Sequence, residues 1–101
     1  MLQMQLAQIV EIITSHKPVE KIVLFGSRAS GRYGRTSDID IAIYGNQWTD
    51  SDINLVKDRL EEEVKTPLKF DLVNFYALTK PSLRRQIVEQ GRVLYDVSKG
   101  A

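Results

Sequence analysis

The sequence contains no cysteine and no long hydrophobic run. Without cysteine, the chain can form neither a disulfide scaffold nor a cysteine-ligated zinc site, which fits a reducing compartment. No segment approaches the roughly 20 consecutive apolar residues that span a bilayer, so we expect no membrane association. The first segment, MLQMQLAQIVEIITSHK, is amphipathic and does not begin with basic residues, so we do not interpret it as a signal peptide. We therefore expect a cytoplasmic protein.

An excess of charge of either sign is also missing. The formal net charge is +1, so no global field favours nucleic acid or an anionic membrane surface. For that reason we expect no direct binding of nucleic acid. The length of 101 residues is that of one small domain, which we expect to span residues 1–101.

The hydrophobic periodicity predicts an alternation of helices and strands. In chain order we expect a helix over 2–15, a strand over 21–25, a polar loop over 26–37, a strand over 38–44, a helix from Thr49 or Asp50 to 65, a strand over 69–75, a helix capped by Thr79 and ended by Gly91, and a strand over 92–95. In the last helix, Leu83, Ile87 and Val88 should point inward.

The loop between the first two strands is too short for a helical crossover. These strands should therefore pair antiparallel, whereas the later strands are separated by helices. This order of elements predicts an α/β (α+β) fold with a mixed sheet of about four strands flanked by helices.

Histidine and tryptophan each occur only once in the sequence, and we consider the role of each. The single histidine, His16, lies at the end of the first predicted helix, where a cation interacts favourably with the helix dipole, so we assign it a structural role. The single tryptophan, Trp48, follows a turn, and it can either be exposed as an interface anchor or pack in the core.

Two aspartates interrupt the second predicted strand. Because side chains alternate along a strand, Asp38 and Asp40 share one face, and the three isoleucines between and after them share the other. The two carboxylates then lie about 6–7 Å apart at the backbone, where a cation between them would relieve their repulsion. Oxygen ligands of this kind suit Mg²⁺. The alternative is a turn aspartate followed by a solvated one on a half-exposed strand.

A glycine and a serine follow the first predicted strand. Gly26 lets a phosphate approach the backbone closely, and Ser27 adds a hydroxyl donor, although such a pair is often an ordinary turn. Together with the carboxylate pair, it indicates a site for a triphosphate. Asp71, in the third predicted strand, can complete a set of three carboxylates for two-metal phosphoryl transfer if that strand pairs beside the second. Alternatively, it is an edge aspartate paired with Lys69 or an arginine.

These residues carry a resemblance to a known superfamily. Gly26-Ser27, ten residues, and then Asp38-Ile39-Asp40 resemble the signature of the DNA polymerase beta-like nucleotidyltransferases, and within them the minimal nucleotidyltransferases (MNT). The resemblance covers nearly the whole chain, including Asp71 and the last predicted helix, which leads into EQGRVLYD. It implies that Asp38, Asp40 and Asp71 are catalytic and bind two Mg²⁺ ions, and that Gly26 and Ser27 contact the phosphates of ATP.

Three arginines crowd the loop beside the predicted phosphate site: Arg28, Arg32 and Arg35. Guanidinium groups donate paired hydrogen bonds to phosphate, and Arg28 is our candidate for a nucleotide contact. The arginines can equally contact an acidic partner or be solvated. Tyr33 can stack on a base or lie on the surface.

The resemblance also implies a partner and an activity. Minimal members are similar to the antitoxins of two-gene toxin–antitoxin modules, whose toxin is an all-helical HEPN ribonuclease. The implied reaction is transfer of AMP from ATP to a tyrosine of that toxin. A binding module that neutralises the toxin by complex formation, without catalysis, remains a second hypothesis. A stand-alone enzyme that modifies nucleotides or RNA is disfavoured, because no broad basic surface is evident.

Overall fold

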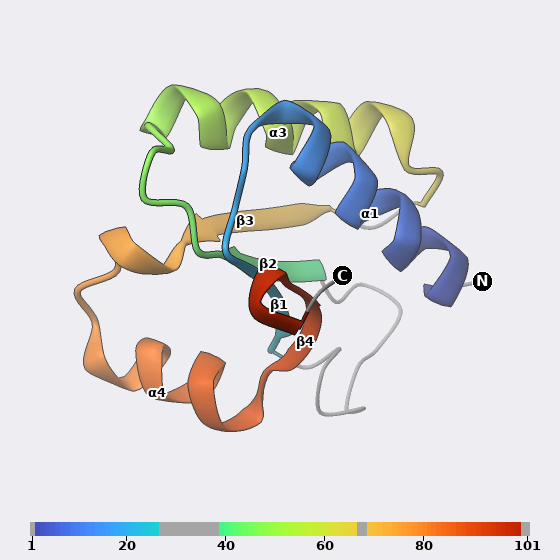
Figure 1. Cartoon of the computed structure of the whole chain (residues 1–101). Helices are drawn as coiled ribbons and strands as arrows, with labels where there is room; N and C mark the ends of the chain where they lie inside the picture. Colours follow the sequence, from blue (N-terminus) through green and yellow to red (C-terminus); the bar gives the residue numbers. More distant parts are fainter. Residues whose placement is uncertain (1, 27–38, 67–68, 100–101) are drawn as a thin grey trace.

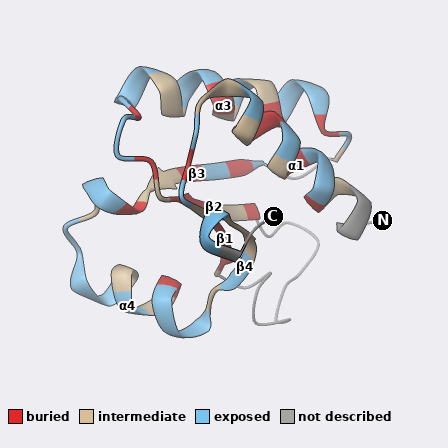
Figure 2. Ribbon diagram, in the orientation of Figure 1, coloured by how far each residue is buried: buried red, intermediate tan, exposed pale blue. Residues whose placement is uncertain are grey.

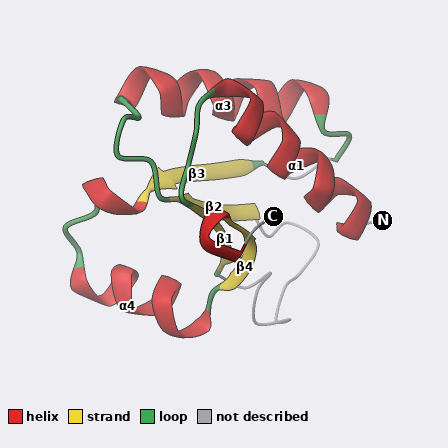
Figure 3. Ribbon diagram, viewed as in Figure 1, coloured by secondary structure: helices red, strands yellow, loops and turns green. Residues whose placement is uncertain are grey.

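The computed structural model describes residues 2–26, 39–66 and 69–99. In this part of the chain a four-stranded sheet lies between helices, with α1 and α3 on one face and α4 on the other (Figures 1 and 3). In chain order the elements are α1 (Leu2–His16), β1 (Lys21–Phe25), β2 (Ile39–Ile43), α3 (Asp50–Glu63), β3 (Phe70–Asn74), the 3-10 helix η1 (Phe75–Ala77), α4 (Pro81–Gln90), β4 (Arg92–Asp96) and the 3-10 helix η2 (Val97–Lys99).

The sheet is mixed, as predicted. Its strand order is β3-β2-β1-β4. β1 pairs antiparallel with both β2 and β4, whereas β2 and β3 pair parallel. The parallel pair is possible because the chain between β2 and β3 forms α3, which crosses one face of the sheet. The expected antiparallel pairing of the first two strands is confirmed.

The core consists of two clusters, one on each face of the sheet (Figure 2). The larger cluster lies under α1 and α3 and includes the strand isoleucines Ile39, Ile41 and Ile43, none of which is exposed. The smaller one lies on the α4 side and consists of Val23, Phe25, Ala42, Phe75 and Ile87. Alternate residues of β1 and β2 therefore enter opposite clusters, as the period of a strand requires.

The cap of α3 agrees with the sequence prediction, whereas the cap of α4 differs from it. α3 begins after Thr49, whose side chain accepts a hydrogen bond from Asp52 N while the Asp52 carboxylate accepts one from Thr49 N, a capping box. The cap of α4 is Lys80 and not Thr79, and Lys80 makes no side-chain cap bond. Pro81 then occupies the first turn, where a backbone N–H would have no acceptor within the helix, so the missing N–H of proline costs no hydrogen bond.

The prediction that Val88 points inward is wrong. Ile87 is 1% exposed, whereas Val88 is 66% exposed. Leu83 and Ile87 are four residues apart and lie on one stripe of α4, as predicted, but Val88 is rotated about 100° from Ile87. The cluster on this face is small, and it accommodates only that one stripe.

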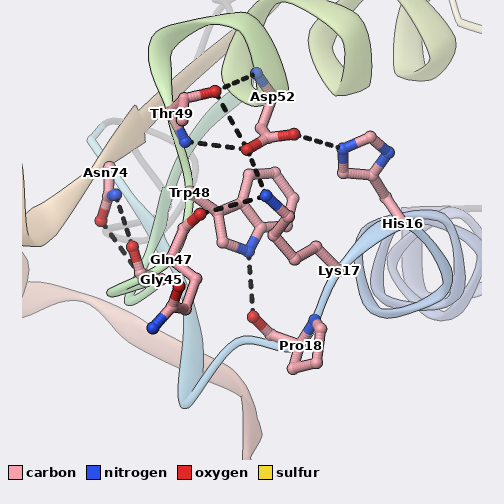
Figure 4. A network of polar contacts seen from close by, with 9 residues as sticks. All are labelled: His16, Lys17, Pro18, Gly45, Gln47, Trp48, Thr49, Asp52 and Asn74. Carbon is pink, nitrogen blue, oxygen red and sulfur yellow. Dashed lines mark hydrogen bonds and ion pairs between the residues drawn. The ribbon is translucent and has the colours of Figure 1, made fainter.

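Trp48 packs in the core and is not an exposed interface anchor. It is 7% exposed and belongs to the cluster under α1 and α3. Its indole Nε1 donates a 3.0 Å hydrogen bond to the carbonyl of Pro18 (Figure 4). In the described residues, no helix has the length and apolar character that crossing a membrane requires.

Candidate active site

Asp40 and Asp71 are neighbours on adjacent parallel strands. They are register partners in the β2–β3 ladder, so their side chains leave the sheet on the same face. That face is the α4 side, because the flanking Ile39 and Ile41 are buried under α1 and α3. Neighbouring strands lie about 4.8 Å apart, so the two carboxylates extend side by side. Asp40 is half-buried, and Asp71, on the edge strand, is exposed.

Gly26, directly after β1, completes this end of the sheet. The β1–β2 register places Phe25 opposite Asp40, so the next residue lies beside the Asp40 carboxylate. Gly26 has a φ of +78°, in the left-handed region that side chains disfavour. A Cβ at this position would come closer than 3.0 Å to Asp40 Oδ2 and within 3.2 Å of Asp40 Cγ. Only glycine therefore allows the carboxylate to lie against the backbone here.

The chemistry of this arrangement is that of a hard-cation site. Two carboxylates on one face supply oxygen ligands, which Mg²⁺ prefers, and substrate phosphate can complete its coordination. Asp71 forms no ion pair with any lysine or arginine in the described part of the chain, so the alternative pairing with Lys69 has no support. Among the described residues no group of three metal-ligating side chains occurs, and the predicted third ligand, Asp38, lies outside them.

The remaining predicted site residues lie outside the described ranges. They are Ser27, Arg28 and Asp38, together with the loop residues Arg32, Tyr33 and Arg35. The structure thus places three of the six predicted site residues, Gly26, Asp40 and Asp71, and brings these three together.

A cavity of about 350 Å³ lies away from this site. Its lining includes Lys21 at the start of β1 and Tyr44 just after β2. Tyr44 is four residues beyond Asp40, or about 13 Å along the strand direction, which separates the cavity from the carboxylates. The sequence did not indicate this cavity, because its walls come from segments that are far apart in the chain.

The polar groups of the cavity pair with one another. Lys21 lies 3.9 Å from Asp96, and its ammonium is 5.3 Å from the centroid of the Tyr44 ring. The Tyr76 hydroxyl donates to the Glu20 carboxylate, and this hydrogen bond raises the pKa of Tyr76. Burial raises the pKa of Tyr44. Both phenols therefore remain protonated at neutral pH.

A second cluster of titratable side chains joins α1 to α3 (Figure 4). The Asp52 carboxylate accepts hydrogen bonds from Lys17 Nζ at 2.7 Å and pairs with His16 Nε2 at 3.0 Å. The bond from Lys17, followed by those from the Thr49 backbone and His16, holds the pKa of Asp52 far below its usual value. His16 thus contributes to holding two helices together, which agrees with the structural role predicted for it.

A carboxylate pair on parallel strands, beside a glycine turn at the end of an antiparallel neighbour, is an arrangement suited to nucleotidyl transfer. The chain belongs to the family described as "Polymerase beta, Nucleotidyltransferase", whose sequence profile matches residues 7–100. The protein is thus a nucleotidyltransferase, and its structural neighbours are of the MNT type, as the sequence motif predicted.

Particular relatives narrow the comparison. A candidate protein adenylyltransferase of Methanocaldococcus jannaschii, MJ0604, is 38% identical, and the match covers 76% of this chain and 79% of that protein. A crystal structure of a toxin–antitoxin with AMP-PNP superposes with a TM-score of 0.80 at 26% identity, over 94% of this chain and 76% of that one. The MNT antitoxin complex with tri-AMPylated HEPN toxin of Shewanella oneidensis shares the fold, with a TM-score of 0.77 at 24% identity over 99% of this chain and 76% of that one.

Proposed function

We propose that this nucleotidyltransferase is the antitoxin of a HEPN toxin and transfers AMP from ATP to a tyrosine hydroxyl of that toxin in a Mg²⁺-dependent reaction. The observation that carries the proposal is the alignment of Asp40 and Asp71 on adjacent strands, with the Asp40 carboxylate against Gly26. Two relatives support it: the candidate protein adenylyltransferase and the toxin–antitoxin with AMP-PNP, a close chemical analogue of ATP.

The donor set fits Mg²⁺. Asp40 and Asp71 would be two of its ligands, and Asp38, two residues before Asp40 in the sequence, would be the third. When bound, two such ions neutralise charge on the triphosphate and lower the pKa of the attacking hydroxyl.

The protein's own residues bind and orient the reactants. Gly26 leaves the end of β1 open to a phosphate, and we assign phosphate contacts to Ser27 and Arg28 as well. The tyrosine oxygen forms a bond to the α-phosphorus, the bond from that phosphorus to the α–β bridging oxygen breaks, pyrophosphate leaves with that oxygen, and the hydroxyl proton passes to solvent. Because Asp71 lies on the exposed edge strand, we place the acceptor tyrosine on the β3 side.

The test is transfer of labelled AMP from ATP to a purified HEPN toxin. Asp40→Asn and Asp71→Asn keep the side-chain size but remove the charge, and each should reduce labelling by about 100-fold or more. Asp58→Asn is the matched control, because Asp58 is exposed on α3, across the sheet from the site.

Labelling that is equal in wild type and in both site variants would refute the catalytic assignment. If the variants lose labelling but still suppress the ribonuclease activity of the toxin, neutralisation occurs by complex formation, which is the second hypothesis. Omission of Mg²⁺, with EDTA present, should abolish labelling of the toxin by the wild-type protein.

A further inference from the structure

The register of the parallel pair β2–β3 decides where Asp71 lies. These strands are joined through α3, so no tight turn sets their alignment, as it would in a hairpin. A slip of one residue would turn Asp71 to the face under α1 and α3. A slip of two residues would keep it on the correct face but move it about 6–7 Å along β2, away from Asp40.

Hydrophobic burial excludes only shifts of β3 along β2 by an odd number of residues. Phe70 and Leu72 are 2% and 5% exposed under α1 and α3, and they must stay on that face. Because a slip of two residues returns apolar side chains to the same face, the hydrophobic pattern penalises it less. Another contact has to distinguish the native register from its even neighbours.

Asn74, the last residue of β3, makes such a contact. Its Nδ2 donates a 2.7 Å hydrogen bond to the carbonyl of Gly45, and its Oδ1 accepts a 3.3 Å bond from Gly45 N. A carboxamide offers the same donor and acceptor as a peptide group. The Asn74 side chain therefore pairs with the backbone beyond the end of β2 as one more rung of the ladder, and a shifted β3 would lose both bonds.

Gly45, which pairs with the Asn74 side chain, is held in place by buried neighbours (Figure 4). Gly45 is buried against the Trp48 indole, so closely that a Cβ on Gly45 would overlap the ring. The indole of Trp48 in turn donates a hydrogen bond to the Pro18 carbonyl. Asn74 Oδ1 also accepts a 3.2 Å bond from Tyr76 N, which ends β3 and begins η1. The amide thus joins the end of β3 to a point with little freedom to move.

We propose that Asn74 is a positioning residue whose double hydrogen bond to Gly45 sets the parallel register of β2 and β3 and so holds Asp71 level with Asp40. The inference rests on the proposed function, in which Asp40 and Asp71 act together. Asn74 itself touches neither the nucleotide nor the acceptor.

The first test compares AMP transfer by wild type, Asn74→Ala and Asn74→Asp at saturating ATP. Asn74→Asp keeps the side-chain size and can still accept the bonds from Gly45 N and Tyr76 N, but it no longer donates to the Gly45 carbonyl. This variant replaces Asn74→Ala in the test if Asn74→Ala does not fold. In either variant kcat should fall about tenfold or more, and the Mg²⁺ concentration for half-maximal rate should rise several-fold. Ile13→Val is the control for a loss of stability alone, because Ile13 is buried in the cluster under α1 and α3, on the face of the sheet opposite Asp40 and Asp71.

The second test locks the register covalently. Ala42 and Val73 are register partners on the α4 face, and the chain has no cysteine of its own. A disulfide between Ala42→Cys and Val73→Cys fits only the native alignment. Oxidation should restore transfer by Asn74→Ala to within about threefold of the same disulfide variant with Asn74 intact.

The outcomes separate the two proposals. If wild type transfers no AMP, the proposed function fails, but the rate of disulfide formation still tests Asn74, and it should be at least several-fold slower in Asn74→Ala. If the Asn74 variants have the same Mg²⁺ dependence as Ile13→Val, Asn74 acts only through general stability. The same conclusion follows if the disulfide forms as fast in Asn74→Ala as with Asn74 intact and its formation does not restore AMP transfer. Either result overturns the inference.

Discussion

Replacing Gly26 with alanine should impair the site more than the fold. Alanine at a φ of +78° costs about 1–2 kcal/mol, partly offset by the lower entropy of the unfolded chain. A net loss near 1 kcal/mol corresponds to a fall of roughly 4–8 °C in the melting temperature of a domain of this size. The larger effect is steric, because the new Cβ would lie closer than 3.0 Å to Asp40 Oδ2.

The carboxylate has to give way, since the backbone of Gly26 continues from the buried strand β1. A displacement of roughly 1 Å at a reacting centre can cost about 100-fold in rate, and that is the reduction in AMP transfer that we expect. The assay is initial-rate transfer per folded molecule over a Mg²⁺ titration, with the folded fraction taken from circular dichroism.

Gly91→Ala is the matched control for this prediction. A Cβ at Gly91 would also overlap its neighbours, but these are the Val23 side chain and the Ile87 carbonyl, away from Asp40. This variant should lose stability and keep its activity per folded molecule. The reasoning is refuted if Gly26→Ala transfers AMP at the wild-type rate with unchanged Mg²⁺ dependence, or if the two variants lose activity equally.

Three further predictions concern stability. Asp52 has a lowered pKa in the folded protein, so its stabilising effect is complete above the usual aspartate value of 3.8 and declines as the pH falls below it. The difference in melting temperature between wild type and Asp52→Asn should therefore shrink as the pH falls below about 4; a difference at pH 2 as large as that at pH 5 would contradict this. Trp48→Phe removes the hydrogen bond to Pro18 and should cost about 1–2 kcal/mol in urea unfolding; no loss would mean that the bond contributes nothing. Ile87→Ala should cost about 2–5 kcal/mol and Val88→Ala under about 0.5, so equal losses would contradict the orientation found for α4.

The elements that were predicted correctly are those with a local signal. After Lys21 the strand is continuously apolar, and Ile22 to Phe25 are buried on both faces of the sheet. The antiparallel pairing of β1 with β2 followed from the length of the loop between them. The cap of α3 was narrowed to two residues, because both Thr49 and Asp50 are good cap formers, and the observed capping box selects Thr49.

An error and an open choice occur where an orientation depends on distant parts of the chain. Whether Val88 is buried depends on how wide the cluster under α4 is, and Phe75 and Val23 from other elements set that width. The sequence left open whether Trp48 is exposed, because its burial depends on the segment after α1, where the Pro18 carbonyl accepts its hydrogen bond. The error in the cap of α4 has a local cause instead, because Pro81, next to Lys80, supports the first turn in place of a capping side chain.

The sequence by itself determined which side chain types lie on each strand face. Alternation places Asp40 opposite the buried isoleucines, and Gly26 at the end of a buried strand predicts close backbone approach. Only the tertiary structure decided that Asp71, about thirty residues later, lies level with Asp40. The physical reason is that parallel register is set by backbone pairing and by contacts between distant segments, such as that of Asn74 with Gly45, and no local pattern records it.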